Sequence, residues 1–373
     1  MNYVNLYECE TYENSNDIII KLINDFPILK NIKNGQKVVI KANLVSALAP
    51  EKGATTNYLL IKYLTRYLTN KGASVLIGDS PGGLYNAAHL NNVYKITKMN
   101  LTGAKLNDNF NVKNVINENA KVLKTFDYTE YLDDADIKIN FCKLKSHAMM
   151  GMSACTKNLF GTIPGLTKSE YHYRFPNHTD FANMLIDLNE YFKFDINIVD
   201  AIIGMDGNGP TMGNPKKIGL ILASTNPYAL DYICSKIINL DPKCVETVKE
   251  SLKRNLFNVD NIILNNDYQK YIVKDFNNIK SNIDIRFFDN SLKGYFLKKI
   301  LDNKPYCKNV KCIHCKKCID ICPQKAIKII NNKIIIDRKK CIKCYCCQEF
   351  CAVGAMQVKK SIISKLLTKK KGM

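Results

Sequence analysis

The sequence predicts an α/β fold in which helices cover both faces of a mostly parallel sheet, followed by a small cysteine-rich α+β domain at the C-terminus. Three observations lead to this prediction. Strand-like and helix-like segments alternate over the first 290 residues, the pattern of βαβ units. Two runs of four cysteines share one spacing near the C-terminus. The 373 residues, 46% of them hydrophobic, can bury the core of more than one domain.

Hydrophobic periodicity and chain breakers predict the elements of the first 290 residues. The segment 55–70 repeats apolar residues at helical spacing, and Gly72 closes it. The amphipathic segment 17–26 is interrupted by Pro27. Residues 240–290 are rich in Asn and weakly patterned, so we expect only a helical closing segment there. The other expected helices are 179–192 and 228–239, and the expected strands are 3–7, 37–41, 74–78, 137–141, 196–199 and 218–223.

The cysteine runs predict metal ligation. Each run reads C-x2-C-x2-C-x3-C, and the second follows the first by 29 positions. Pro323 follows the first run, and Ala352 takes that place in the second. Three thiolates two residues apart can wrap three irons of one cubane, and the fourth ligand then comes from the other run. We therefore expect two [4Fe–4S] clusters, the first on Cys312, Cys315, Cys318 and Cys351, and the second on Cys322, Cys341, Cys344 and Cys347.

Zinc and disulfides are the alternatives to iron–sulfur clusters. Zinc sites usually take two well-separated C-x2-C pairs, and a disulfide framework suits a small secreted domain. Neither Cys307 nor Cys346 is needed as a ligand. Residues 306–358 resemble a bacterial-type two-cluster ferredoxin domain. The expected organisation is an α/β domain over 1–290, a linker over 291–305, the ferredoxin domain over 306–358 and a basic tail over 359–373, either a solvated end or a membrane-surface contact.

Charge and composition limit the partners and the compartment. The formal net charge of +20 favours acidic partner proteins or anionic small molecules. No nucleic-acid reader motif accompanies this charge, so nucleic-acid binding is not expected. No apolar run reaches the roughly 18 residues of a membrane span, and the first 16 residues lack a signal pattern. The 15 cysteines suit a reducing compartment, so we expect a cytoplasmic protein in an anaerobic setting.

Polar residues follow several of the expected strands, at the sheet edge where open parallel sheets bind ligands. Lys and Asp can also end strands simply because they leave the core. Taken together, however, these strand ends predict a shared crevice for an anion. The expected substrate-binding residues are Lys41, Asn43, Asp79, Ser80, Lys157, Asn158, Asp200 and Asp206, and the expected catalytic residues are Lys145, His147 and His172.

The stretch 140–178 is the most informative part of this crevice. Its Lys and His residues lie among glycines and small residues, which suits a carboxylate or phosphate held by ammonium and N–H groups. His147 and His172 could move protons near neutral pH, or could be structural. A third metal site from Cys142, His147 and Cys155 matches no known ligand spacing, and buried thiols are the alternative.

The turn-rich segment 200–215, with Asp206 at its centre, lacks the Walker A and G-x-G-x-x-G patterns, so ATP and NAD are not expected. KANLV at 41–45, GDSPGG at 78–83, KLKSH at 143–147, KNLFGTIPG at 157–165 and DAIIGMDGNGP at 200–210 occur in this order, before ALD at 229–231. Together they resemble the uncharacterised DUF362 family, iron–sulfur cluster-binding type, over about residues 20–240. KANLV departs from the usual KPN form at Ala42. The resemblance implies a domain boundary and a site location, but no reaction.

Three functions follow from these features. The first is ferredoxin-type electron transfer through two [4Fe–4S] clusters, coupled to an anionic small-molecule or cofactor site in the α/β domain, as in an iron–sulfur oxidoreductase of undefined substrate. The second is a non-enzymatic electron carrier whose large domain docks partners. The third is a sensor in which the clusters gate the binding of an anionic polymer, which salt would weaken. A redox partner protein fits the first two functions.

Overall fold

The computed structural model describes residues 1–278 and 304–359. In that part of the chain a nine-stranded sheet runs in the order β11-β1-β10-β9-β7-β2-β3-β4, and β8 pairs with β7. The neighbours from β9 to β4 are parallel, whereas β10 is antiparallel to both β9 and β1. The mostly parallel sheet is therefore confirmed. Its strands are β1 (Asn2–Glu8), β2 (Lys37–Ala42), β3 (Ser74–Gly78), β4 (Lys105–Leu106), β7 (Ile137–His147), β8 (Gly151–Ser153), β9 (Ile196–Asp206), β10 (Asn214–Ser224) and β11 (Ile262–Leu264).

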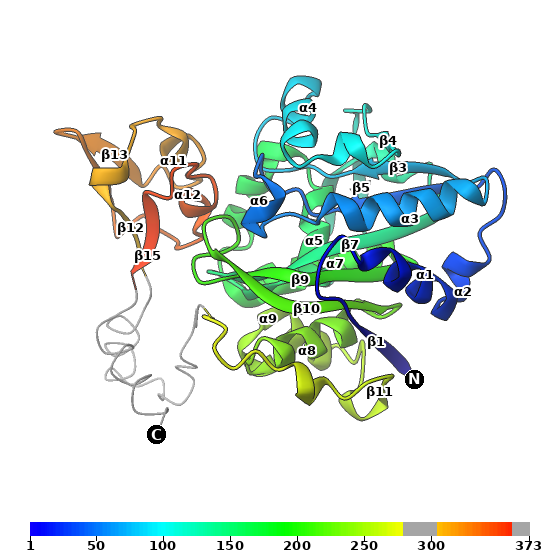
Figure 1. The fold of residues 1–373 in the computed structure, drawn as a ribbon. Coiled ribbons are helices and arrows are strands. Elements are labelled where there is room, and N and C mark those ends of the chain that lie inside the picture. Colours follow the sequence, from blue (N-terminus) through cyan, green and yellow to red (C-terminus); the bar gives the residue numbers. More distant parts are fainter. Residues whose placement is uncertain (279–303, 360–373) are drawn as a thin grey trace.

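Helices cover both faces of this sheet, as predicted (Figure 1). Asn57, Asn177 and Asn226 cap three of them, because each side-chain oxygen accepts a hydrogen bond from a backbone N–H of the first turn. The helices are α1 (Ser15–Asp25), α2 (Pro27–Lys30), α3 (Tyr58–Asn70), α4 (Ala87–Ile96), α5 (Cys155–Asn158), α6 (Lys168–Arg174), α7 (His178–Phe192), α8 (Pro227–Ile237) and α9 (Glu246–Lys253).

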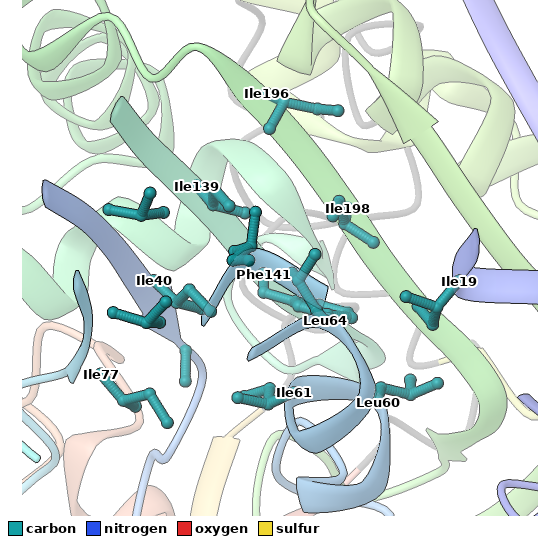
Figure 2. Packing of buried hydrophobic residues seen from close by; sticks show 14 of the residues in the cluster. Ile19, Ile40, Leu60, Ile61, Leu64, Ile77, Ile139, Phe141, Ile196 and Ile198 are labelled. Atoms are coloured by element: carbon teal, nitrogen blue, oxygen red, sulfur yellow. The ribbon is translucent and has the colours of Figure 1, made fainter. Parts of the chain in front are cut away.

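Successive side chains along each strand point to opposite faces of the sheet, so a hydrophobic core forms on each face. Val38 and Ile40 of β2 pack with α1, α3 and α4 on one face, and Val39 between them packs with α7 on the other. Figure 2 shows the first core, where Ile40 and Ile139 of the sheet face Leu64 of α3. The helix α8 covers the second face beside β9 and β10. The sheet is thus buried on both sides, which leaves its carboxyl edge as the place for a ligand.

The segment 240–278 differs from its prediction. It contains α9, as a helical segment should, but also the strand β11, which pairs in parallel with β1. Three residues are too few for a period-2 pattern to show in the sequence. A hairpin of β5 (Val112–Ile116) and β6 (Thr125–Thr129) was also not predicted.

The C-terminal unit is a structural duplication. Its first half contains β12 (Lys304–Cys307), α11 (Lys317–Asp320) and β13 (Ile327–Ile330), and its second half contains β14 (Lys333–Ile336), α12 (Cys346–Glu349) and β15 (Met356–Lys359). Each element of the second half lies 29 positions after its counterpart. The strand β12 pairs with β15, and β13 pairs with β14. Left-handed residues recur at the same offset, at His314 and Lys343 and at Lys316 and Tyr345. The predicted small α+β unit is confirmed.

The expected boundaries near this unit lie largely outside the described residues. The strand β12 begins at Lys304, two residues before the expected start at 306. Residues 291–303 of the expected linker and 360–373 of the expected tail lie outside the described residues. Across the described ranges, no helix combines the length and the apolar character needed to cross a bilayer.

Candidate functional site

A cavity of about 800 Å³ lies between the large sheet domain and the C-terminal unit. The loops that follow β2 and β3 form part of one wall, and residues of α11 and α12 and directly after them form the other. Figure 1 shows the C-terminal unit, in orange and red, beside the large domain near α6. The cavity is large enough for a drug-sized organic molecule. The cavity lies at the carboxyl edge of the parallel strands, the edge at which open parallel sheets bind ligands.

A buried ion pair supports the cavity floor. Nζ of Lys41 lies 2.7 Å from Oδ1 of Asp79, and both side chains are buried. Oδ2 of Asp79 accepts a hydrogen bond of 2.6 Å from the backbone N–H of Leu44. Burial lowers the pKa of Lys41, although Asp79 opposes this effect. A Cβ at Gly161 would lie 2.2 Å from Oδ1 of Asp79, so only glycine lets the backbone approach this pair.

A chain of amides connects this floor to Lys145. Asn158 donates through Nδ2 to Oδ1 of Asn140 at 2.7 Å and accepts from Nδ2 of Asn43 at 2.8 Å. Nζ of Lys145 donates to Oδ1 of Asn43 and to the carbonyl of Ala54, both at 2.8 Å. An ammonium has three N–H donors, so one of them is available to a ligand in the cavity. Burial, and then the charge of Lys157, lowers the pKa of Lys145 to about 7.

Two more lysines line the cavity. Nζ of Lys168 donates to the carbonyls of Ser80 and Ile163, at 2.6 and 2.5 Å. Burial lowers its pKa to about 7, against the opposing charge of Asp79. Burial also lowers the pKa of Lys157, and Glu349 of the C-terminal unit opposes this effect. Three cationic side chains with lowered pKa values thus face one space, which suits an anion.

His147 contacts the C-terminal unit. Its Nδ1 accepts hydrogen bonds from the backbone N–H groups of Met149 and Met150, at 3.2 and 3.1 Å. The proton of the neutral ring therefore lies on Nε2, which is 2.8 Å from Oε1 of Glu349 in a contact that is not aligned as a hydrogen bond. Burial lowers the pKa of His147 to about 4. Burial alone would raise the pKa of Glu349, but His147 and Lys157 outweigh it and lower the pKa of this carboxyl.

His172 lies in the aromatic part of the wall. Its ring stacks on Phe181 with centroids 4.4 Å apart, and Phe160 meets it edge-on. It is 3% exposed, and its Nδ1 has no hydrogen-bond partner among the described residues. Burial lowers its pKa to about 3, so the ring is neutral at physiological pH. A neutral imidazole with an unsatisfied nitrogen on a cavity wall can accept or donate a hydrogen bond to a ligand.

The residues predicted for the site fall into three groups: some line the cavity, some lie behind its wall and some lie away from it. Lys41 and His147 lie directly behind the cavity wall. Asp200 pairs instead with Lys143 at 2.8 Å, and Asp206 accepts from the backbone of Asn277 at 3.1 Å, so neither lines the cavity. The predicted residues that line the cavity together are Asn43, Asp79, Ser80, Lys145, Lys157, Asn158 and His172.

Two further cavity residues carried no sequence signal. Lys168 lies in a short helix after a turn, and Glu349 lies between two cysteines, so neither follows a strand of the sheet. Cys142 and Cys155 have Sγ atoms 3.4 Å apart, but His147 faces Glu349 instead of them.

Cysteines of the two runs lie near one another, and Cys347 of the second run is near both Cys318 and Cys322 of the first. Burial raises the pKa of Cys318 to about 11, with added contributions from the nearby Cys351, Cys312 and Cys315. Burial likewise raises the pKa of Cys341, to which Cys344 and Cys322 contribute. The fourth cysteines receive matching hydrogen bonds of 3.2 Å, from Ala326 N–H to Sγ of Cys322 and from Ala355 N–H to Sγ of Cys351. Each run therefore sends its fourth thiol toward the other run.

Comparison with known proteins decides the family. The model of "Domain of unknown function (DUF362)" matches residues 38–236, which is over half of the chain. The chain belongs to the DUF362 family. The matched range of the DUF362 domain includes every predicted site residue outside the cysteine runs.

One curated relative and one solved structure extend the comparison of this DUF362 protein. The chain is 30% identical over 229 residues to "Thylakoid-associated protein sll1697" of Synechocystis sp., covering 58% of this chain and 67% of that protein. It also resembles the lactate racemase apoprotein from Thermoanaerobacterium thermosaccharolyticum, with 10% identity and a TM-score of 0.43. That match covers 64% of this chain and 58% of the racemase chain, and it is too loose to support an inference.

Proposed function

We propose that this DUF362 protein is an iron–sulfur oxidoreductase in which a two-cluster ferredoxin domain exchanges electrons with an anionic small molecule or cofactor in the cavity. One observation carries the proposal. Cys351, a predicted cluster ligand, lines the same cavity as Lys145, Lys157 and Lys168. An electron donor and an anion site thus adjoin a single space.

The cysteine groups fit two [4Fe–4S] clusters. In residues 1–278 and 304–359, no three Cys, His, Asp or Glu side chains converge on one metal ion. A cubane makes a different demand, because each thiolate binds its own iron and the four sulfurs surround the cluster instead of one point. The interleaved proximity of the thiols, and the N–H groups directed at Cys322 and Cys351, meet that demand. When bound, such clusters supply one-electron transfer, commonly at low potential.

The large domain would supply binding and proton transfer. Lys157 and Lys168 bind the anionic group of the ligand, since both are cations on the cavity wall, Lys157 near Glu349 and Lys168 near Asp79. Lys145 holds or releases a proton at Nζ near neutral pH, which suits a reaction that adds protons with electrons. His172 orients the ligand from the aromatic wall.

The contact between the two units keeps the clusters next to the cavity. Nε2 of Gln348 donates to the carbonyls of Asn208 and Gly209, and the hydroxyl of Thr211 donates to the carbonyl of Glu349. A Cβ at Gly82 would lie 2.8 Å from Cζ of Phe350, so the backbone of the large domain closely approaches the C-terminal unit. A fixed distance favours electron transfer within the chain over a diffusing carrier. We place this activity in the cytoplasm, because oxygen-sensitive clusters need a reducing compartment.

The first test is composition. Anaerobic purification should give about eight irons and eight sulfides per chain, and mass spectrometry of the denatured protein should detect any co-purifying small molecule. Zinc in place of iron, or a dithionite-treated sample without a paramagnetic signal, would overturn the proposal.

The second test is turnover. Clusters reduced with substoichiometric dithionite are mixed with a panel of carboxylate and phosphate metabolites, and reoxidation is followed by visible absorbance. Reoxidation by one compound, lost in Lys145→Ala, is the expected result. If Lys145→Ala retains function in cells while Cys315→Ala abolishes it, the large domain only docks partners and the protein is an electron carrier.

A further inference from the structure

The two halves of the C-terminal unit have different surroundings. The outer loop, residues 308–317, and the inner loop, residues 337–346, are equivalent by the 29-residue offset. Tyr345 of the inner loop is 4% exposed and packs into the core of the large domain, whereas its counterpart Lys316 is exposed. Cys346 is buried and its counterpart Lys317 is exposed. The inner loop thus packs against the large domain, whereas the outer loop is exposed to solvent as far as Lys316, and Lys317 at its end lines the cavity.

The outer loop exposes apolar side chains beside a predicted cluster ligand. Val310 is 89% exposed and Ile313 is 63% exposed. Cys315 is exposed as well, although the other three thiols of its predicted cluster are at least partly covered. Exposed apolar residues are normal one at a time, but here Val310 lies just before the first cysteine run and Ile313 lies inside it, both within five residues of Cys315. Such a surface indicates a protein contact that brings a partner close to the cluster.

The charge of the outer loop defines the kind of partner. The loop contains Lys308, Lys311, Lys316 and Lys317 and no Asp or Glu. All four lysines are exposed, and none forms an ion pair with the part of the chain that the structure describes. An apolar centre with a cationic rim is complementary to an apolar patch with an acidic rim.

We propose that the outer loop is the docking site of a small acidic one-electron carrier protein, which exchanges electrons with the cluster held by Cys312, Cys315, Cys318 and Cys351. This inference rests on the proposed function. In each exchange the reduced carrier loses one electron and the oxidised cluster gains it. Cys315 is exposed to the carrier and Cys351 lines the cavity, so the docking site and the cavity adjoin different sides of one cluster. A basic apolar loop could also contact an anionic membrane, but that contact would not explain an exposed cluster ligand at its centre.

The test compares charge reversal in the two loops. Lys311→Glu with Lys316→Glu alters the outer loop, and Lys339→Glu with Lys340→Glu is the matched control, because these inner-loop lysines are also exposed. Flavodoxin in its hydroquinone form is the carrier, and the second-order rate of cluster reduction is followed by stopped-flow absorbance at low and high salt. Reduction of each variant by excess dithionite reports whether the clusters are present.

We expect the outer-loop variant to be reduced by flavodoxin at least about tenfold more slowly at low salt, with most of the salt dependence lost. The control pair should change this rate less than about twofold. Val310→Ser with Ile313→Ser should weaken flavodoxin binding while leaving the salt dependence intact.

Each other outcome has a defined meaning. If dithionite reduces no variant, including the unaltered chain, the proposed function itself has failed. If dithionite reduces all of them and both lysine pairs slow flavodoxin equally, the docking site is overturned. The same holds if the outer-loop variant loses binding to vesicles of anionic phospholipid without a change in the flavodoxin rate, because the loop is then a membrane contact.

Discussion

Nε2 of His147, at the end of β7, lies 2.8 Å from Oε1 of Glu349, at the end of α12. The first residue belongs to the DUF362 domain and the second to the cysteine-rich unit, so the contact connects the two across the cavity wall. Lys157 adds a positive charge to the same place. The helix that carries Glu349 also carries Cys347, a predicted cluster ligand. Glu349, a charged residue of the cavity wall, therefore lies two positions from each of the predicted cluster ligands Cys347 and Cys351.

Glu349→Gln should weaken the attachment of the C-terminal unit. The substitution removes the carboxylate whose charge favours protonated Lys157, and removing one partner of a buried charge contact costs up to about 3–5 kcal/mol. Because the Glu349 side chain is 15% exposed, we expect a loss of about 2 kcal/mol in the free energy of unfolding. Anaerobic urea denaturation measures this loss, with the exposed Glu10→Gln as control. Equal stability of the two variants would show that the contact stabilises nothing.

Lys41→Met should destabilise the large domain by about 3–5 kcal/mol, because the carboxylate of Asp79 stays buried without its cation. The double variant Lys41→Met with Asp79→Asn should recover at least about 1 kcal/mol of that loss. Urea denaturation measures the free energy of unfolding of the unaltered chain, the two single variants and the double variant, which together form a double-mutant cycle. Additive losses would contradict a direct interaction between the two side chains.

Much of the site could be predicted because it follows strand ends. Lys41 lies near the carboxyl end of β2 and Asp79 directly follows β3, and parallel strands bring such positions to one edge. Lys145 follows the apolar segment 137–141 in the sequence, but β7 continues through it to His147. The two cysteine quartets rest on spacing, because cubane ligation fixes the sequence distance between thiols, and their assignment stays a prediction. Asp200 also follows this logic, but its carboxylate binds Lys143, and no sequence pattern distinguishes a buried pair from a ligand site.

The remainder depends on contacts between distant segments. Glu349 reaches the cavity only because α12 packs on the large domain through Gln348, 140 residues away from its acceptor Asn208. The direction of β10 was equally open, because alternating hydrophobicity is the same for parallel and antiparallel strands. The strand β11 consists of three residues stabilised by pairing with β1, which the local sequence does not specify.

Cys351→Ser and Cys346→Ser should distinguish a predicted cluster ligand, Cys351, from a nearby cysteine that is not a predicted ligand, Cys346. Both residues line the cavity and both are buried, so the pair is matched for position. Cys351→Ser removes the fourth thiol of one predicted cluster and should lower the iron content from about eight toward four per chain. Cys346→Ser should leave it unchanged. Iron and sulfide analysis after anaerobic purification measures both, and a reversed result would reassign the ligands.

His172→Phe should make the protein less sensitive to acid. Burial places the pKa of His172 at about 3, below the unfolded value of about 6.5, so the native ring must stay neutral. The unfolded state therefore binds more protons between these values, and stability falls as pH decreases through that window. Removing the imidazole should preserve about 2 kcal/mol of stability at about pH 4.5 and change little at neutral pH. Urea midpoints at both pH values test this expectation, and an unchanged acid loss would reject it.

Lys145 and Lys168 should make ligand affinity and stability respond to pH in opposite directions. Both have a pKa near 7 in the native cavity, so both become neutral as pH rises through that value. Sulfate, which does not titrate in this range, should therefore bind at least about fivefold more weakly at about pH 8.5 than at about pH 6. Isothermal titration calorimetry measures this change, and it should disappear in Lys145→Met with Lys168→Met.

The free energy of unfolding should increase as pH rises, in contrast to the affinity for sulfate. An unfolded lysine keeps its proton up to about pH 10.4, so between about pH 7 and 10 the unfolded state binds more protons than the native state. The free energy of unfolding then rises with pH over this window, and the double Met variant should lack that rise. Alkaline loss of the fold would lower affinity and stability together, so an increase in stability with a loss of sulfate binding, both absent from the double Met variant, identifies Lys145 and Lys168 as the titrating groups. Sulfate affinity that is equal at both pH values would show that these ammonium groups do not hold the anion.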